Sequence, residues 1–292
     1  MVRPRIAFGS IVKISNQLAN FGNGLIEYAL RKSLIEPDFE FNLLDPISDK
    51  LLQKLKMFDF VINPGATHLT PQETQSVKQL YKLGSKLVVT GASIWNKYPA
   101  DLSLARSCYQ PVGVRDPHTH KLLVNAKIPS SFVGCPVLLL DYADAQKEDK
   151  KLVFSFSRHD VPAQIEVIKK LAEKFKVTIV CHESCELLYN VPEGIRVASG
   201  EDPETIIHEY STASLAITGR LHGALPAAIS NTPLIYFDTF KDSRSTLLSF
   251  LGIQVVKLNE INSRDYSKVD QNKLNQLRKH FLDYLALLEV KK

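Results

Sequence analysis

Residues 141–156 read Asp141-Tyr142-Ala143-Asp144-Ala145-Gln146-Lys147-Glu148-Asp149-Lys150, followed by Lys151-Leu152-Val153-Phe154-Ser155-Phe156. The first ten residues are polar and aperiodic, whereas the next six form an apolar run typical of a buried strand. On both sides of this stretch, β-branched runs alternate with segments of helical periodicity, a pattern typical of parallel α/β architecture. The sequence therefore predicts an α/β fold with two Rossmann-like halves that have mainly parallel sheets.

The predicted units are an N-terminal Rossmann-like domain at residues 1–140, a linker at 141–150, a C-terminal Rossmann-like domain at 151–270 and a terminal helix at 271–292. The expected strands are 5–8, 39–44, 58–63, 86–90, 111–114, 131–133, 151–156, 177–181, 195–198, 215–218, 233–237 and 254–256. The expected helices include 24–34, 72–83, 164–175, 203–210, 221–230 and 243–251. Two such halves place a ligand cleft between them, at the carboxyl ends of the parallel strands.

Composition excludes several classes of protein. The chain has 292 residues, of which 45% are hydrophobic and 23% charged, a composition that is neither disordered nor fibrous. Its 36 Lys+Arg against 31 Asp+Glu give a net charge of +5, too small to indicate nucleic-acid binding. No run approaches the ~20 apolar residues of a transmembrane helix, and the N-terminus does not resemble a signal peptide. We expect a cytoplasmic protein with no nucleic-acid partner.

The four cysteines, Cys108, Cys135, Cys181 and Cys185, are too few for a disulfide framework and are expected to be reduced thiols. The stretch Cys181-His182-Glu183-Ser184-Cys185 resembles half of a metal site. The chain offers no second Cys/His cluster to complete four ligands, so a strand end running into a turn is the preferred interpretation. No metal and no cofactor are predicted.

The stretch Ala216-Ile217-Thr218-Gly219-Arg220-Leu221-His222-Gly223-Ala224-Leu225 predicts an anion site. A buried strand brings Arg220 and His222 to the turn that opens the next helix, and glycines there allow backbone to approach a ligand. The helix amides and dipole, a guanidinium and an imidazole together suit a phosphate, or a phosphate and a carboxylate. The alternative is that Arg220 pairs with a neighbouring carboxylate beside a core histidine.

A second arginine follows a strand in Val112-Gly113-Val114-Arg115-Asp116-Pro117. Asp116 is predicted to be a helix N-cap, with Pro117 at the first helical position. Arg115 is expected to project from the strand end toward the cleft, where it would bind an acidic substrate. A local ion pair is an alternative of equal weight.

The glycines near residue 22 are not a dinucleotide fingerprint. In Gly22-Asn23-Gly24-Leu25-Ile26-Glu27 the third glycine of G-x-G-x-x-G is replaced by Glu27, which argues against a nicotinamide enzyme. What remains is a loop before a helix, in which Asn23 is able to donate a hydrogen bond. A plain turn and cap is an equally supported interpretation.

Two further loops directly follow strands, at residues 63–68 and 90–96. Their small residues keep a groove open, and His68, Ser93 and Asn96 are candidates to bind a polyhydroxylated ligand. Trp95, the only tryptophan, is placed either to stack on a sugar face or to pack within the protein.

The order of these motifs resembles the polysaccharide pyruvyl transferase family over roughly residues 8–253. The specific part is Arg220-Leu221-His222-Gly223 with the upstream Arg115-Asp116; Asn231-Thr232-Pro233 and Lys241 follow downstream. The resemblance implies a glycosyltransferase-B-like fold and the transfer of pyruvate from phosphoenolpyruvate, as a ketal, to a sugar of a cell-surface glycan or its precursor.

The same resemblance implies roles for individual residues. Arg220 and His222 match the donor-binding Arg and His, and Arg115 matches the arginine of the Arg-Asp motif. His222 is then either the general acid or a phosphate ligand, because its unperturbed pKa lies near physiological pH. Leu221, Gly223 and Lys241 join the candidate substrate-binding set with Asn23, His68, Ser93 and Asn96.

The chain departs from the family pattern mainly on the acceptor side. It has Asn63-Pro64-Gly65-Ala66-Thr67 where many relatives are rich in glycine, Cys135-Pro136 where an acidic-Pro pair is common, and no Asp after the glycine of the first helix. The expected acceptor is a saccharide or lipid-linked saccharide, which would bring the protein to the inner face of a membrane.

Two other functions are compatible with the same architecture. A glycosyltransferase with a nucleotide-sugar donor requires an acidic residue for the ribose at a strand end, and Glu183 and Asp238 are the candidates. A non-catalytic glycan-binding protein would bind sugar independently of Arg220.

Overall fold

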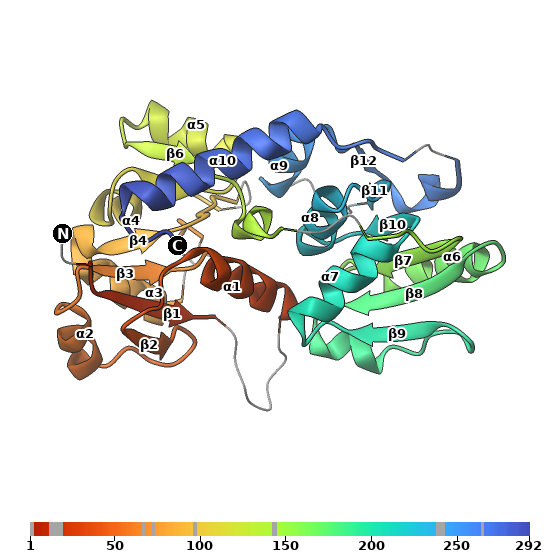
Figure 1. The fold of residues 1–292 in the computed structure, drawn as a ribbon, viewed down its shortest axis with the longest axis horizontal. Coiled ribbons are helices and arrows are strands. Elements are labelled where there is room, and N and C mark those ends of the chain that lie inside the picture. The colour runs from red at the N-terminus through yellow and green to blue at the C-terminus, as the bar shows by residue number, and fades with distance from the viewer. Residues whose placement is uncertain are drawn as a thin grey trace.

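The computed structural model describes residues 3–11, 20–65, 68–71, 74–95, 98–141, 145–237, 243–263 and 266–292. In this part of the chain, two parallel α/β halves are connected in sequence by residues 141–150 (Figure 1). Every pairing between named strands is parallel, as the alternating sequence pattern predicts.

The N-terminal half is built on a four-stranded sheet in the order β2-β1-β3-β4. Its strands are β1 (Ile6–Ser10), β2 (Phe39–Asn42), β3 (Phe60–Asn63) and β4 (Leu87–Val89). A two-stranded sheet of β5 (Val112–Val114) and β6 (Ser130–Phe132) adjoins it through a bridge between Ala92 and Val114. The helices are α1 (Phe21–Ser33), α2 (Asp49–Leu55), α3 (Gln75–Leu80), α4 (Leu102–Ser107) and α5 (Pro117–Asn125).

The C-terminal half contains a six-stranded sheet in the order β12-β11-β10-β7-β8-β9. Its strands are β7 (Lys151–Ser155), β8 (Lys176–Cys181), β9 (Arg196–Ser199), β10 (Leu215–Thr218), β11 (Leu234–Phe237) and β12 (Val255–Val256). Its helices are α6 (Val161–Ala172), α7 (Pro203–Thr212), α8 (Leu221–Ile229) and α9 (Arg244–Phe250). The central position of β7 and β10 explains why both read as continuous apolar runs.

The last helix, α10 (Gln271–Leu287), connects the end of the C-terminal half back to the N-terminal half (Figure 1). It contacts β6 and the short 3-10 helix η2 (Pro136–Leu139). The chain then pairs with the end of α1, where the Ile35 N–H donates to Val290 O at 2.9 Å. The side chains that α10 buries recur at helical spacing: Leu274, Leu277, Phe281, Tyr284 and Leu285.

Helix starts follow the capping chemistry of the sequence. Asp116, Asp160 and Asp202 are the N-caps of α5, α6 and α7, and each of these helices has a proline in its first turn. The predicted role of Asp116 as an N-cap is confirmed, because its Oδ1 accepts from Thr119 N at 2.8 Å.

The hydrophobic core runs through both halves. One buried cluster extends from the four-stranded sheet through α1 and η2 to α8 and one face of the six-stranded sheet. A second cluster lies on the opposite face of that sheet, under α6. The two halves therefore share a continuous core, in which α1 is a central element (Figure 1).

The structure corrects several predicted elements. Helix α1 begins at Phe21, so Gly22, Asn23 and Gly24 lie in its first turns and not in a preceding loop. The helix predicted at 72–83 is divided into α3 and a 3-10 segment, Tyr81–Lys86, where Gly84 has a φ of 61°. Helices α2 and α4 were not predicted, because segments of six or seven residues are too short to show a helical repeat.

Among the described residues, the structure has no helix that is both long and apolar enough to cross a bilayer.

Candidate functional site

Three neighbouring strands of the six-stranded sheet end at the same edge and supply most of the candidate site. Strand β10 leads into Gly219 and Arg220, β7 into Ser157 and Arg158, and β8 into residues 182–186. Because parallel strands present their carboxyl ends together, side chains that are far apart in sequence meet here.

The turn between β10 and α8 has little free space. Arg220 is the N-cap residue of α8, and the Leu221 side chain that follows is only 3% exposed, within the core. A Cβ atom on Gly223 would overlap Tyr210 Oη and lie 2.5 Å from Thr218 Oγ1. Gly223 is therefore needed here for the packing of α8 against its neighbours.

The Arg220 guanidinium donates several hydrogen bonds at this edge of the sheet. Its Nε donates to Phe156 O at 2.7 Å, and Nη1 and Nη2 each lie 3.1 Å from an oxygen of Glu183. Nη2 also donates to Glu186 Oε1. The arginine thus has the carboxylate partners of the ion-pair alternative that the sequence left open.

The two glutamates have opposite pKa shifts. Burial would raise the pKa of Glu183, but the hydrogen bonds and charges of Arg220 and Arg158 outweigh it and lower that pKa below its ordinary value. Burial dominates at Glu186 and raises its pKa, although the Arg220 charge opposes the rise. The backbone N–H of His182 donates to Glu186 Oε2 at 2.7 Å and fixes this carboxyl in the interior.

His182 is a buried neutral imidazole beneath the glutamates. Burial lowers its pKa to about 3, and the Arg220 charge adds to the effect. Its Nε2 lies 3.1 Å from Tyr210 Oη, and burial raises the pKa of that phenol. His182 therefore belongs to the support of Arg220.

His222 lies where the two halves meet. A Cβ atom on Gly22, in the first turn of α1, would overlap the His222 Nδ1 atom. The Phe21 N–H donates to His182 O at 2.8 Å, and Asn20 forms an antiparallel bridge with Glu183. The start of α1 is thus docked against the group formed by Arg220, Arg158, His182, Glu183 and Glu186, which we call the Arg220 cluster. Asn23 is half-buried in the same turn.

Arg115 forms a second group of candidate residues in the N-terminal half. It follows β5, is 4% exposed, and its Nη2 donates to Ser93 Oγ at 2.7 Å. His68 Nδ1 lies 3.1 Å from the same Ser93 oxygen. The structure thereby brings together three residues predicted from three separate loops.

Trp95 packs against this second group. Its ring lies 4.1 Å from that of His68, centroid to centroid, and 6.2 Å from that of Tyr98. Of the two predicted roles for Trp95, the structure shows the packing one. Asn96, Lys241 and Asp238 lie outside the described residues.

Sequence reasoning missed three members of the Arg220 cluster: Arg158, His182 and Glu186. The stretch 181–185 was considered for metal binding, and Glu183 also as a ribose ligand of a nucleotide-sugar donor, but neither interpretation paired it with Arg220. The available signal was the spacing of two glutamates, at positions 183 and 186, just after a buried strand. Within the described residues, no group of three or more His, Cys, Asp or Glu side chains has the arrangement of a metal site.

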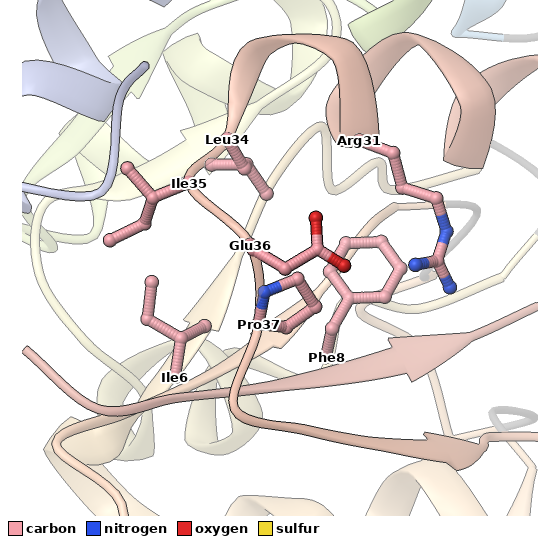
Figure 2. Close-up of a pocket in the computed structure, with 7 residues that line it drawn as sticks. All are labelled: Ile6, Phe8, Arg31, Leu34, Ile35, Glu36 and Pro37. Carbon is pink, nitrogen blue, oxygen red and sulfur yellow. The ribbon is translucent and has the colours of Figure 1, made fainter.

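Figure 2 shows a cavity of about 130 Å³ at a different place, between the end of α1 and the start of β1. Its lining is Ile6, Phe8, Arg31, Leu34, Ile35, Glu36 and Pro37. Arg31 is bound there to Glu27 and Glu40, at 2.7 and 2.9 Å. None of the predicted site residues lines this cavity.

The fold is similar to that of solved UDP-N-acetylglucosamine 2-epimerases and of a glycosyltransferase. The structure resembles a putative UDP-N-acetylglucosamine 2-epimerase from Listeria monocytogenes, with a TM-score of 0.58 at 10% identity over 96% of this chain and 91% of that chain. It also resembles UDP-GlcNAc 2-epimerase from Methanocaldococcus jannaschii, with a TM-score of 0.54 at 12% identity over 96% of this chain and 92% of that chain. The glycosyltransferase SnogD from Streptomyces nogalater gives a TM-score of 0.50 at 13% identity over 98% of this chain and 100% of that chain. The fold is therefore glycosyltransferase-B-like, as expected.

Within this fold class, the family described as polysaccharide pyruvyl transferase matches residues 20–239. That match covers most of the chain, and the chain belongs to this family. The family expected from Arg115-Asp116 and Arg220-Leu221-His222-Gly223 is thus confirmed. No curated protein sequence matches the chain.

Proposed function

We propose that the protein transfers pyruvate from phosphoenolpyruvate to a saccharide as a ketal. The observation that carries the proposal is the position of His222, which follows Arg220 at the edge of the C-terminal sheet and touches Gly22 of the N-terminal half. A group at this junction is able to reach a donor held by one half and an acceptor held by the other. Family membership supports the same chemistry.

In the proposed reaction, a proton adds to the methylene carbon of phosphoenolpyruvate and C2 becomes electrophilic. One sugar hydroxyl attacks C2, a second hydroxyl displaces phosphate by breaking the C2–O bond, and both hydroxyl protons are released. One proton balances the new methyl group and the other leaves with phosphate. His222 supplies the proton to carbon in this scheme, acting as general acid.

The donor contacts in the proposal come from the two arginines. Arg220 and Arg115 bind the phosphate and the carboxylate of the donor, because guanidinium groups match both anions with paired hydrogen bonds. Leu221 and Gly223 shape the backbone beside the donor, and Lys241 adds a charge. We assign the donor mainly to residues 151–270, with Arg115 contributed by the N-terminal half.

The acceptor side belongs to residues 1–140 in this proposal. Ser93 and His68 already form a polar group with Arg115. We assign Asn23 and Asn96 to acceptor binding as well. Hydroxyl, amide and imidazole groups are suited to the hydroxyls of a sugar. The reaction would occur in the cytoplasm, at the inner membrane face when the acceptor is lipid-linked.

The test is release of inorganic phosphate from phosphoenolpyruvate in the presence of a panel of saccharide acceptors. We expect acceptor-dependent release in the wild-type protein and none in His222→Asn with retained donor binding. Release without dependence on any acceptor would contradict ketal transfer. A thermal-shift comparison with uridine and guanosine diphosphate sugars separates this function from nucleotide-sugar transfer, because a bound ligand raises the unfolding temperature.

A further inference from the structure

Glu183 lies between two arginines of the Arg220 cluster, Arg158 and Arg220. Its Oε1 accepts from Arg158 Nε at 2.8 Å and from Arg220 Nη1 at 3.1 Å, while its Oε2 accepts from Arg220 Nη2 at 3.1 Å. The arrangement with Arg220 is the paired geometry with which guanidinium groups bind carboxylates and phosphates. A carboxylate of the protein itself therefore fills an anion position.

The two glutamates of the cluster differ in how firmly they are held. The Glu186 side chain is 0% exposed, and its Oε2 accepts from the His182 N–H in addition to the contact with Arg220. The Glu183 side chain is 16% exposed, and its short contacts run to the two arginines, with Cys185 Sγ at 4.0 Å. Glu183 is thus the carboxylate that is able to leave Arg220.

Arg158 gives the displaced carboxylate a place to remain. Its side chain is 54% exposed, in contrast to 12% for Arg220, so it is able to follow Glu183 outward without opening the core. Keeping the Arg158 pair avoids leaving Glu183 as an unpaired charge in a half-buried position.

We propose that Glu183 is an internal stand-in for the donor's anionic group: it pairs with the Arg220 guanidinium until a phosphate group binds, and then moves onto Arg158. This inference rests on the proposed function, because it concerns how that donor gains access to Arg220. A phosphate group carries up to two negative charges near neutral pH, against one for a carboxylate. A phosphate group therefore competes with Glu183 for Arg220 more strongly than a simple carboxylic acid does.

The test measures binding of inorganic phosphate and of phosphoenolpyruvate by calorimetry to the wild-type protein and to Glu183→Gln. The amide of glutamine keeps the shape of the side chain and removes its charge. We expect both ligands to bind about tenfold more tightly to Glu183→Gln, the order of one charged hydrogen bond that no longer competes. Pyruvate, which lacks the phosphate, is expected to gain at least as much.

Two further variants separate exchange from a general change of charge. Glu166→Gln removes an equal charge from the exposed Glu166–Lys169 pair on α6 and is expected to leave both affinities unchanged. Glu186→Gln removes a charge beside Arg220, but from a carboxyl that stays in place, and is expected to tighten binding less than Glu183→Gln. If Glu183→Gln does not fold, Glu183→Asp, one methylene shorter, replaces it and is expected to tighten binding by a smaller factor.

Unchanged or weaker binding in Glu183→Gln, or equal tightening in Glu186→Gln, would overturn the exchange while leaving the proposed function intact. If neither phosphate nor phosphoenolpyruvate binds to any of these proteins, the donor in the proposed function is wrong and the exchange falls with it.

Discussion

At the residue scale, the candidate site consists of charged groups whose partners determine their chemistry. Arg115 and Arg220 were predicted from their positions after strands, and both do lie at strand ends. Their partners were not predictable, because Ser93, Glu183 and Glu186 reach them only through the pairing of neighbouring strands. Sequence patterns record where a strand ends, but not which side chains of adjoining strands point toward each other.

The buried imidazole of His182 predicts a specific pH dependence of stability. Its pKa is about 3 in the folded protein and 6.5 in an ordinary environment, so the unfolded chain binds the proton first. This contribution to stability is complete above pH 6.5 and is lost as the pH falls toward 3. Between pH 7.5 and 5.5 the loss is about 1.4 kcal/mol.

Urea unfolding of the wild-type protein and of His182→Asn at these two pH values measures this contribution. Tyr210, Arg220 and Glu183 interact with the imidazole and are retained in both proteins. We expect the free energy of unfolding of the wild type, relative to that of His182→Asn, to be about 1.4 kcal/mol lower at pH 5.5 than at pH 7.5. The exposed His280→Asn serves as control, and an equal pH slope in wild type and His182→Asn would rule out the buried neutral state.

At the element scale, the start of α1 differs from the sequence-based expectation. The three polar or small residues Gly22, Asn23 and Gly24 indicated a loop, whereas Asn20 caps a helix that begins before them, with Oδ1 accepting from Gly22 N at 3.1 Å. Gly22 is needed here because a Cβ atom at this position would overlap His222 Nδ1. Tertiary contact therefore overrides the local preference of glycine for loops.

Substitution of Gly22 tests this docking. Gly22→Ala places a methyl group on His222 Nδ1 and must shift either the imidazole or α1. We expect kcat/KM for phosphoenolpyruvate to fall about 10- to 100-fold, the order of loss for a catalytic group misplaced by 1 Å. Lys32→Ala, at an exposed position of the same helix, is the matched control. Normal activity in Gly22→Ala would show that the contact does not position His222.

The terminal helix was expected at residues 271–292, and α10 spans Gln271–Leu287. Phe281 is 0% exposed and Leu287 is 69% exposed on the same helix. We expect Phe281→Ala to lower the free energy of unfolding by about 3–5 kcal/mol, because a large core side chain is lost. Leu287→Ala is expected to change it by less than about 0.5 kcal/mol. Urea unfolding compares the two, and similar losses would contradict the docking of α10.

At the scale of the whole molecule, the alternation of strands and helices was enough to predict two parallel α/β halves. The strand order was not predictable, because β7 and β10, 60 residues apart in sequence, become neighbours only through the crossover of the sheet. The shared core through α1 and η2 also depends on contacts between the halves. Together these contacts place His222 at the junction on which the proposed function depends.

The central claim is that phosphoenolpyruvate is bound through Arg220, and calorimetric titration of the wild-type protein and Arg220→Lys tests it most directly. Lysine keeps the charge but loses the paired geometry of the guanidinium. We predict binding to the wild type and an affinity at least about tenfold lower in the variant, the cost of one charged hydrogen bond. Equal affinity in both proteins, or no binding to the wild type, would contradict the claim.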